Sequence, residues 1–253
     1  MASYDLMGNI AVIKGEGRSA KEKLELAKKL IERPSVKTVV EKVGNVKGRL
    51  RTIGVKHILG EKNLIADYKE NGCVFRFNVE SCYFSPRLSG ERKAIAEKVK
   101  KKDSVLVMFA GVGVFPIVIS KFGKGSRIVG VEIGRDCCKW FEENLKLNKV
   151  KNVEVVQGDV KKKIDGSEKF DVVVMARPNL KDSFLEWGLK GGKKGSKLFY
   201  YGFCNVDEID DLVKGLVEEG KGFGRRLKVV EVVKAGDIAP YKFRYRIEYM
   251  FLN

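Results

Sequence analysis

Two glycines and two carboxylates follow three successive apolar segments of this sequence. Gly111 and Gly113 come directly after the apolar stretch 105–109, and glycine lets a backbone approach a ligand closely. Glu132 ends the next apolar stretch, 19 residues after Gly113, where an acidic side chain accepts hydrogen bonds from ribose hydroxyls. Asp159 follows the third stretch, at a position where a carboxylate reads an adenine amino group. The pattern predicts a nucleoside-binding site.

The glycine loop also distinguishes between nucleoside ligands. A dinucleotide fingerprint needs a third glycine, and Pro116 stands near that position. This argues against a tightly packed pyrophosphate and against NAD. We therefore expect S-adenosylmethionine as the cofactor, with a purely structural turn as the weaker alternative.

The elements that must position this loop alternate between strand and helix from about residue 88. Such alternation is typical of a parallel sheet with helices on both faces. Cys138, Phe141 and Leu145 share one face of a predicted helix, and Asp207 is expected to cap another. The predicted strands are 104–109, 127–132, 153–156, 170–175, 197–201, 227–233 and 244–251. Since no helix separates the last two, we expect an α/β fold whose doubly wound sheet ends in an antiparallel hairpin.

The first 85 residues show a different, α+β pattern. Ser19 and Glu22 form a capping-box motif, and the helix that they start should stop before Pro34. Strands are predicted at 10–13, 36–43 and 73–79. We therefore expect two domains, a small RNA-binding domain at 1–85 and a cofactor-binding domain at 86–253.

Charge points to a polyanionic partner. The chain has 50 Lys and Arg against 33 Asp and Glu, a net charge of +17 that both halves share. A basic excess spread in this way favours nucleic acid, with a lysine-rich surface kept for solubility as the alternative.

Other classes of protein are disfavoured. No apolar run is long enough to cross a membrane, and no signal peptide is visible, so we expect a cytoplasmic protein without a membrane partner. His57 is the single histidine and no Cys-x-x-Cys pair exists, which argues against a metal site. The five cysteines are expected to be reduced and to pack as small hydrophobes, with one of Cys137 and Cys138 exposed.

Three blocks in fixed order carry a family resemblance. They are YFSPRLSGER at 83–92, MFAGVG at 108–113 and ENLKLNK at 143–149, with weaker similarity at 36–48 and 57–61. The sequence resembles the archaeal and eukaryotic tRNA (guanine-N1)-methyltransferases that act at position 37, whose relatives include the wybutosine-pathway aminocarboxypropyl transferase. The resemblance implies a class I, Rossmann-like fold, S-adenosylmethionine as cofactor, and the anticodon loop of tRNA as partner. It further implies a monomer that lacks the additional N-terminal domain of many family members.

The resemblance also implies roles for individual residues. Glu91 matches the family's general base and Arg51 its stabiliser of guanine O6; alone, Glu91 would be a first-turn helix acid and Arg51 a phosphate contact. The implied cofactor-binding residues are Tyr83, Arg92, Phe109, Gly111, Gly113, Glu132 and Asp159. The implied substrate-binding residues are Arg87, Arg177, Pro178 and Asn179. Four aromatic residues are candidates for stacking on the target base, although core packing is the favoured role for each: Phe115, Tyr200, Tyr201 and Phe203.

Two departures from the family pattern keep alternatives open. Ala176 stands where the family has an Asn that positions guanine, so Arg177 or Asn179 is expected to take over that role. Val107 stands where an acidic residue is common. Transfer of an aminocarboxypropyl group, methylation of a tricyclic base, and non-catalytic RNA binding therefore remain alternatives to guanine methylation.

Overall fold

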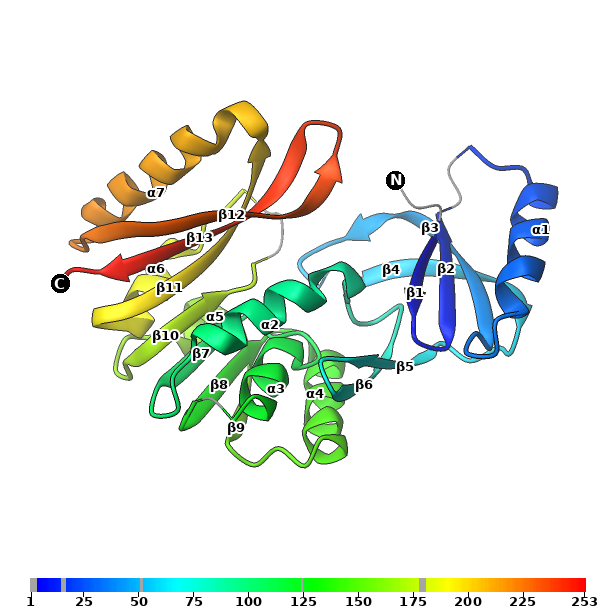
Figure 1. Cartoon of the computed structure of the whole chain (residues 1–253), viewed down its shortest axis with the longest axis horizontal. Helices are drawn as coiled ribbons and strands as arrows, with labels where there is room; N and C mark the ends of the chain where they lie inside the picture. The colour runs from blue at the N-terminus through cyan, green and yellow to red at the C-terminus, as the bar shows by residue number, and fades with distance from the viewer. Residues whose placement is uncertain (1–3, 15–16, 51, 124, 178–180) are drawn as a thin grey trace.

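The structure is a computed structural model that describes residues 4–14, 17–50, 52–123, 125–177 and 181–253 (Figure 1). Arg51, Pro178 and Asn179, to which the sequence assigns roles, lie outside the described residues. The strands are β1 (Tyr4–Met7), β2 (Ile10–Lys14), β3 (Thr38–Lys47), β4 (Thr52–Gly60), β5 (Ile65–Glu70), β6 (Cys73–Asn78), β7 (Ser104–Met108), β8 (Arg127–Glu132), β9 (Val153–Gln157), β10 (Phe170–Met175), β11 (Gly192–Asn205), β12 (Leu227–Ala239) and β13 (Lys242–Phe251). The helices are α1 (Ala20–Ile31), α2 (Ser89–Lys98), α3 (Val114–Lys121), α4 (Arg135–Leu147), α5 (Val160–Lys163), α6 (Leu185–Gly191) and α7 (Ile209–Gly222), with 3-10 turns η1 (Pro86–Leu88) and η2 (Val206–Glu208).

The N-terminal part is a four-stranded sheet in the order β1-β2-β3-β4, with α1 on one face. Ser19 accepts from the backbone N–H of Glu22, and the Glu22 carboxylate accepts from the backbone N–H of Ser19, so the predicted capping box is confirmed. Ala27 and Leu30 of α1 are buried against Ile13 of the sheet. This packing of small and branched apolar residues holds α1 on one face of the four-stranded sheet.

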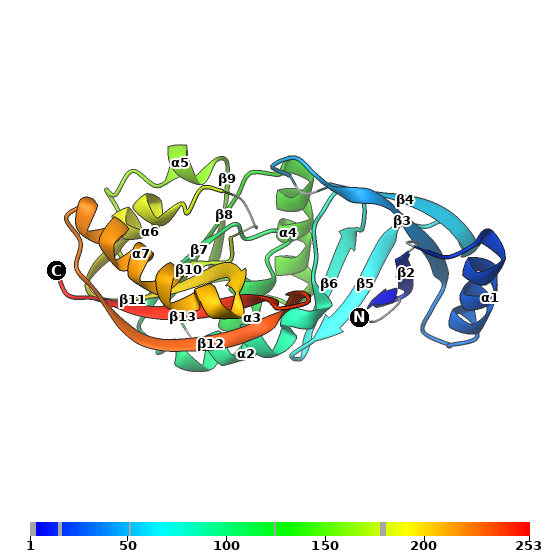
Figure 2. The ribbon, with the colours of Figure 1, turned by 90° about the horizontal axis from the view of Figure 1, so that it is seen from above.

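Strands β5 and β6 form a separate antiparallel pair between the two sheets. Phe75 and Phe77 of β6 are fully buried in a core that they share with residues of α2, α3 and the central sheet. Figure 2 shows this pair lying between α4 and the N-terminal sheet. We therefore propose that the boundary between the two parts lies near residue 64 instead of residue 85.

Two asparagines of α4 take the place of a neighbouring strand for β6. The Asn144 Oδ1 accepts from the backbone N–H of Arg76 at 2.7 Å, and its Nδ2 donates to the Arg76 carbonyl at 3.1 Å. Asn148, one helical turn later, makes the same pair of bonds with Val74, at 2.9 and 2.6 Å. Asn144 also donates to the carbonyl of Val112 at 3.0 Å, so one buried side chain joins β6 to the glycine loop.

The C-terminal part is built on a seven-stranded sheet in the order β12-β13-β11-β10-β7-β8-β9. Strands β7 to β11 are parallel, and β13 and β12 run antiparallel at one edge, as the sequence predicts. Helices α2, α3 and α4 cover one face, and α5, α6 and α7 cover the other (Figures 1 and 2). The class I methyltransferase fold expected from the sequence is therefore the observed one.

Successive side chains along each strand point to opposite faces of the sheet and pack into two separate cores. Val105 and Val107 of β7 pack toward α2 and α3, whereas Leu106 and Met108 pack toward α6. Val107, the departure from an acidic residue, is thus a buried core position. Because β7 to β11 run parallel, their carboxyl ends lie at one edge of the sheet, where the loops converge.

Several local expectations differ from the structure. Asn205, not Asp207, forms the capping box before α7, with Glu208 as its partner. The terminal strands extend past the predicted 227–233 and 244–251, because β12 and β13 stay paired almost to their connecting turn. The end of this hairpin points toward the N-terminal part in both views (Figures 1 and 2).

The cysteine expectation is also wrong for one pair. Cys82 and Cys137 form a disulfide with a Cα–Cα distance of 5.5 Å, although they are 55 residues apart in sequence. Neither Cys137 nor Cys138 is exposed, because both side chains are packed against the residues that surround α4. The odd number and irregular spacing of the cysteines do not reveal this pair in the sequence. The disulfide forms because the fold brings the segment before Tyr83 across the start of α4.

Candidate active site at the carboxyl ends of the central strands

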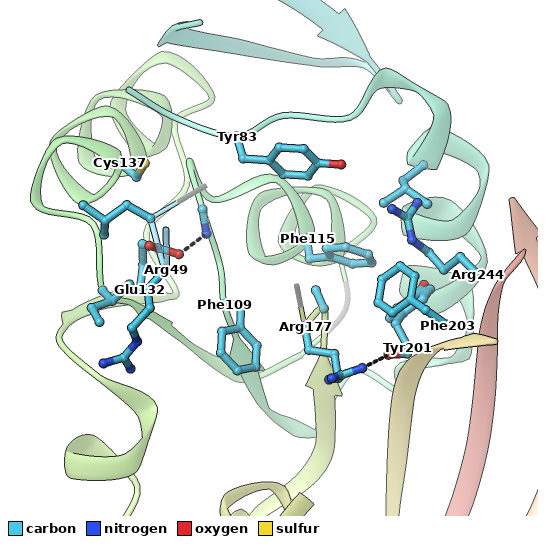
Figure 3. A pocket seen from close by; sticks show the side chains of 15 residues that line it. Arg49, Tyr83, Phe109, Phe115, Glu132, Cys137, Arg177, Tyr201, Phe203 and Arg244 are labelled. Carbon is cyan, nitrogen blue, oxygen red and sulfur yellow. Dashed lines mark hydrogen bonds between the residues drawn. The ribbon is translucent and has the colours of Figure 1, made fainter. Parts of the chain in front are cut away.

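A cavity opens where the loops after β7, β8 and β10 and the strand β11 meet the N-terminal part (Figure 3). Residues from both parts of the chain form its wall. They are Arg49, Leu50, Tyr83, Leu88, Phe109, Gly111, Phe115, Glu132, Ile133, Cys137, Ala176, Arg177, Tyr201, Phe203 and Arg244. The carboxyl edge of a parallel sheet is where ligands of this fold class bind.

Glu132 is the half-buried acidic group of the cavity. Its two oxygens accept from the backbone N–H groups of Gly111 and Gly134, each at 2.8 Å. Burial raises the pKa of the Glu132 carboxyl, and the N–H donors of Gly134 and Gly111 oppose that shift. The carboxylate is therefore held in a fixed orientation beside the cavity, with further lone pairs that hydroxyl groups of a ligand can use.

The two predicted glycines have different roles. Gly111 has φ +57° and lines the cavity, as expected for close backbone approach to a ligand. Gly113, at φ +87°, packs on the ring of Phe141, where an added Cβ would stand 2.0 Å from a ring carbon. Gly113 does not line the cavity and serves the packing of the loop on α4.

Phe109 and Asp159 lie at the adenine side expected from the sequence. Phe109 has φ +61°, a strained conformation for a bulky residue, and its ring contacts the edge of Phe184. A smaller pocket that shares Phe109 and Ile133 with the main cavity is lined by Asp159. The two hollows together form one cleft along the loops after β7, β8 and β9.

An arginine from the N-terminal part crosses this cleft. Arg49 donates to Asp159 at 2.6 Å, and it lines both hollows. Burial alone would raise the pKa of the Asp159 carboxyl, but the hydrogen bonds from Arg49 and from the Lys161 N–H lower it. The loop between β3 and β4 thus contributes a wall of the candidate site.

Cationic and aromatic side chains face each other on the other side of the cavity. Arg177 is buried, donates to the carbonyl of Asp182 at 2.7 Å, and has its guanidinium 5.8 Å from the centre of the Phe203 ring. The guanidinium of Arg244 lies 5.3 Å from the same ring (Figure 3). Such a set of planar cations and rings is suited to a nucleobase, which stacks on both kinds of group.

Glu91 lies directly behind the cavity wall. It does not line the cavity, but Tyr201, which does, donates from its hydroxyl to the Glu91 carboxylate at 3.0 Å. Arg246 donates to the same carboxylate at 3.0 Å. Burial raises the pKa of Tyr201 well above its ordinary value, so its hydroxyl stays protonated and remains a donor.

Three other predicted residues have distinct positions. Tyr83 lines the cavity. Arg92 does not: it is buried in a two-pronged ion pair with Glu70 and also donates to the Ser85 carbonyl at 3.1 Å. Arg87 is half exposed and pairs with Asp5 of the N-terminal sheet at 3.1 Å. The structure therefore brings Tyr83, Phe109, Gly111, Glu132 and Arg177 to the cavity, with Asp159 in the adjoining pocket.

Sequence reasoning missed several residues of the cavity wall. Arg49, Leu50 and Arg244 come from loops and strands far from the glycine loop, and nothing in their local pattern marks them. Of the aromatic residues considered, Phe115, Tyr201 and Phe203 line the cavity, whereas Tyr200 packs in the opposite core. The alternation of Arg244 and Arg246 with Tyr245 and Ile247 was the one available signal, since it puts both arginines on one face of β13.

Two further findings concern the described part of the chain. It contains no group of three or more His, Cys, Asp or Glu side chains arranged to hold a metal ion. None of the helices found there has the length and apolar character needed to cross a bilayer.

Comparison with known proteins gives two adjacent family matches. Residues 66–230 match the TRM5/TYW2 methyltransferase domain, and residues 1–63 match the TYW2 N-terminal domain. The two matches meet close to residue 64, where β4 ends and β5 begins.

Individual relatives cover nearly the whole chain. The tRNA (guanine(37)-N(1))-methyltransferase Trm5b of Pyrococcus abyssi is 31% identical over 98% of this chain and 74% of its own. The tRNA (guanine(37)-N(1))/4-demethylwyosine(37)-methyltransferase Taw22 of Nanoarchaeum equitans is 29% identical over 97% of this chain and 98% of its own. Among solved structures, aTrm5 in complex with tRNALeu has a TM-score of 0.86 and 26% identity, covering 100% of this chain and 72% of its own.

Proposed function

The chain belongs to the TRM5/TYW2 methyltransferase family, and on that basis we propose that it transfers a methyl group from S-adenosylmethionine to N1 of guanosine 37 in the anticodon loop of tRNA. One observation carries the proposal: a nucleoside-type cleft with a half-buried carboxylate opens into a cavity walled by cations and aromatic rings. The first feature fits a cofactor and the second an RNA base. We further propose that the protein acts as a monomer in the cytoplasm.

The residues of the cleft fit S-adenosylmethionine, the methyl donor of this family. Glu132 is fixed by two backbone N–H groups and keeps lone pairs for ribose hydroxyls. Phe109 and Ile133 offer apolar surface for adenine, beside the carboxylate of Asp159. When bound, this cofactor supplies a methyl group already activated by a positively charged sulfur.

Guanine N1 carries a proton at neutral pH and must lose it to become a nucleophile. We assign the acceptor role to Glu91, which lies behind Tyr201 and stays 14% exposed. The N1–H bond breaks and its proton moves to the Glu91 carboxylate, while the methyl group that N1 gains would come from the cofactor as its carbon–sulfur bond breaks and the electron pair stays on sulfur. The base must first leave the stacked loop, and the rings of Phe203 and Phe115 are available to stack on it.

Negative charge grows on guanine O6 while the proton leaves. A cationic donor beside O6 stabilises that charge most effectively in a site shielded from water. We retain Arg51 for this role on the strength of the family resemblance. Arg177 and Arg244 line the cavity, and we assign them to orienting the base or its phosphate.

A second candidate function has specific support. Ala176 lines the cavity with a short side chain at the position where the family has an Asn that positions guanine. The N. equitans relative, which matches along almost its whole length, is named for both guanine and 4-demethylwyosine. Methyl or aminocarboxypropyl transfer to a wyosine-type base at the same position is therefore the alternative to test.

The deciding experiment incubates the protein with S-adenosylmethionine and an unmodified tRNA transcript, then identifies modified nucleosides by mass. We expect 1-methylguanosine at position 37, a gain of about 14 Da, against about 101 Da for an aminocarboxypropyl group. Glu91→Gln should remove most of the rate, because the amide cannot accept the proton.

The other outcomes separate the alternatives. Transfer only to a tRNA that already carries a wyosine-type base would favour the second candidate. Tight, salt-dependent tRNA binding without any transfer would leave a non-catalytic RNA-binding protein.

A further inference from the structure

We propose that Arg246 is a positioning residue for Glu91: it orients the carboxylate and leaves one of its oxygens to accept the substrate proton. The inference rests on the proposed function and adds to it the residue that orients the base. Arg246 lies on β13, 155 residues from Glu91 in sequence.

The two donors to Glu91 meet at a single oxygen. The Arg246 Nη1 and the Tyr201 hydroxyl both donate to Oε2, each at 3.0 Å. Within the described residues, no hydrogen bond reaches the other oxygen, Oε1. A carboxylate bound in this way has one oxygen committed to the protein and one available to a ligand.

Arg246 is itself held rigidly. Its side chain is 4% exposed, and its second Nη donates to Glu231 of β12 at 3.1 Å. Glu231 also accepts from Lys98 at 2.7 Å, and Lys98 pairs with Glu248, the residue two positions after Arg246 on β13. The hairpin and both ends of α2 therefore form one network, in which Glu91 is the member nearest the cavity.

This geometry suits positioning better than stability alone. A buried ion pair is a weak source of folding free energy, because the desolvation of both charges offsets their attraction. The helix is already tied to the hairpin by Lys98, seven residues after Glu91 on the same face. A second tie at Glu91 adds little to that attachment but fixes the orientation of the carboxylate.

The test measures single-turnover methyl transfer to a tRNA transcript for a double-mutant set. We expect Arg246→Gln to slow transfer by about 10- to 100-fold, because the Glu91 carboxylate loses its fixed orientation. Arg246→Lys, which keeps the charge, should recover part of the rate. In the Glu91→Gln background, Arg246→Gln should slow methyl transfer by less than about 2-fold, because the carboxylate that Arg246 orients is already absent.

Arg127→Gln is the matched control. Arg127 also pairs with two glutamates, Glu154 and Glu168, but at the opposite end of the sheet. It should leave the rate unchanged. Thermal melting and cofactor binding report on folding, and if Arg246→Gln is unfolded, the double variant, which removes both charges, and Arg246→Lys remain as tests.

The outcomes separate this inference from the proposed function. An equal loss from Arg246→Gln in the wild-type and Glu91→Gln backgrounds would overturn the inference, since Arg246 would then act independently of Glu91. A rate for Arg246→Lys no higher than that of Arg246→Gln would overturn it as well. Absence of 1-methylguanosine with wild-type protein contradicts the proposed function instead, and the same set is then measured on whichever product forms.

Discussion

Replacing Asn144 by alanine tests how β6 is held against α4 and the glycine loop. The asparagine makes three hydrogen bonds to backbone groups: the N–H and carbonyl of Arg76, and the carbonyl of Val112. Each such bond contributes about 0.5–1.5 kcal/mol net, and backbone groups left unpaired cost more. The structure therefore predicts a loss of about 3 kcal/mol in the free energy of unfolding, since Asn144 is fully buried.

Urea unfolding followed by circular dichroism measures that loss, and hydrogen exchange locates it. The backbone N–H of Arg76 donates to Asn144 and should exchange much faster in the variant. Lys146→Ala, an exposed change on the same helix, should shift the free energy of unfolding by less than about 0.5 kcal/mol.

A loss below about 1 kcal/mol, together with unchanged exchange at Arg76, would refute the reasoning. It would mean that β6 is held by the packing of Phe75 and Phe77 alone. The asparagine pair would then be a consequence of the docking of β6, not its cause.

Three more predictions follow from the same structure. Gly113→Ala should destabilise the fold by about 2–4 kcal/mol in urea unfolding, because its Cβ would meet the Phe141 ring in a left-handed backbone conformation; an unchanged midpoint would contradict this. Arg49→Gln should change the free energy of unfolding by less than about 1 kcal/mol, as expected for an exposed pair, yet speed cofactor release severalfold in stopped-flow experiments; equal release rates would show that Arg49 is no barrier. The hydrogen bond from Lys98 lowers the pKa of Glu231 below its reference of 4.5, so the stabilisation is present above that pH and is lost as pH falls through the lower, folded-state value. Thermal melts from pH 6 to pH 3 should therefore fall more steeply for wild type than for Glu231→Gln, and parallel curves would exclude this contribution.

The sequence predicted those features that depend on neighbouring residues. The capping box at Ser19 and Glu22 involves four consecutive positions, and its two partners are within reach in any helix that begins there. Glu132 was identified for the same reason, because a strand end and a glycine loop place it whatever the rest of the chain does. Local physical chemistry was enough at these sites.

The remaining features depend on which distant segments meet. Arg246 reaches Glu91 because β13 pairs with β11 in one register, which opposes Tyr201 and Arg246 directly. A shift by one residue would turn both side chains to the opposite face. The ion pair between Arg49 and Asp159 and the disulfide between Cys82 and Cys137 also join distant segments. Neither produces a periodic pattern in the sequence.

Arg49 and Leu50 form one wall of the cavity, so the position of this wall affects the binding of both the cofactor and the RNA. Any RNA that changes the orientation of the N-terminal sheet also changes how tightly that wall closes on the cofactor. Linkage then requires reciprocity: the factor by which tRNA alters cofactor affinity equals the factor by which cofactor alters tRNA affinity. Changes at residues 49 and 50 should therefore alter both affinities together.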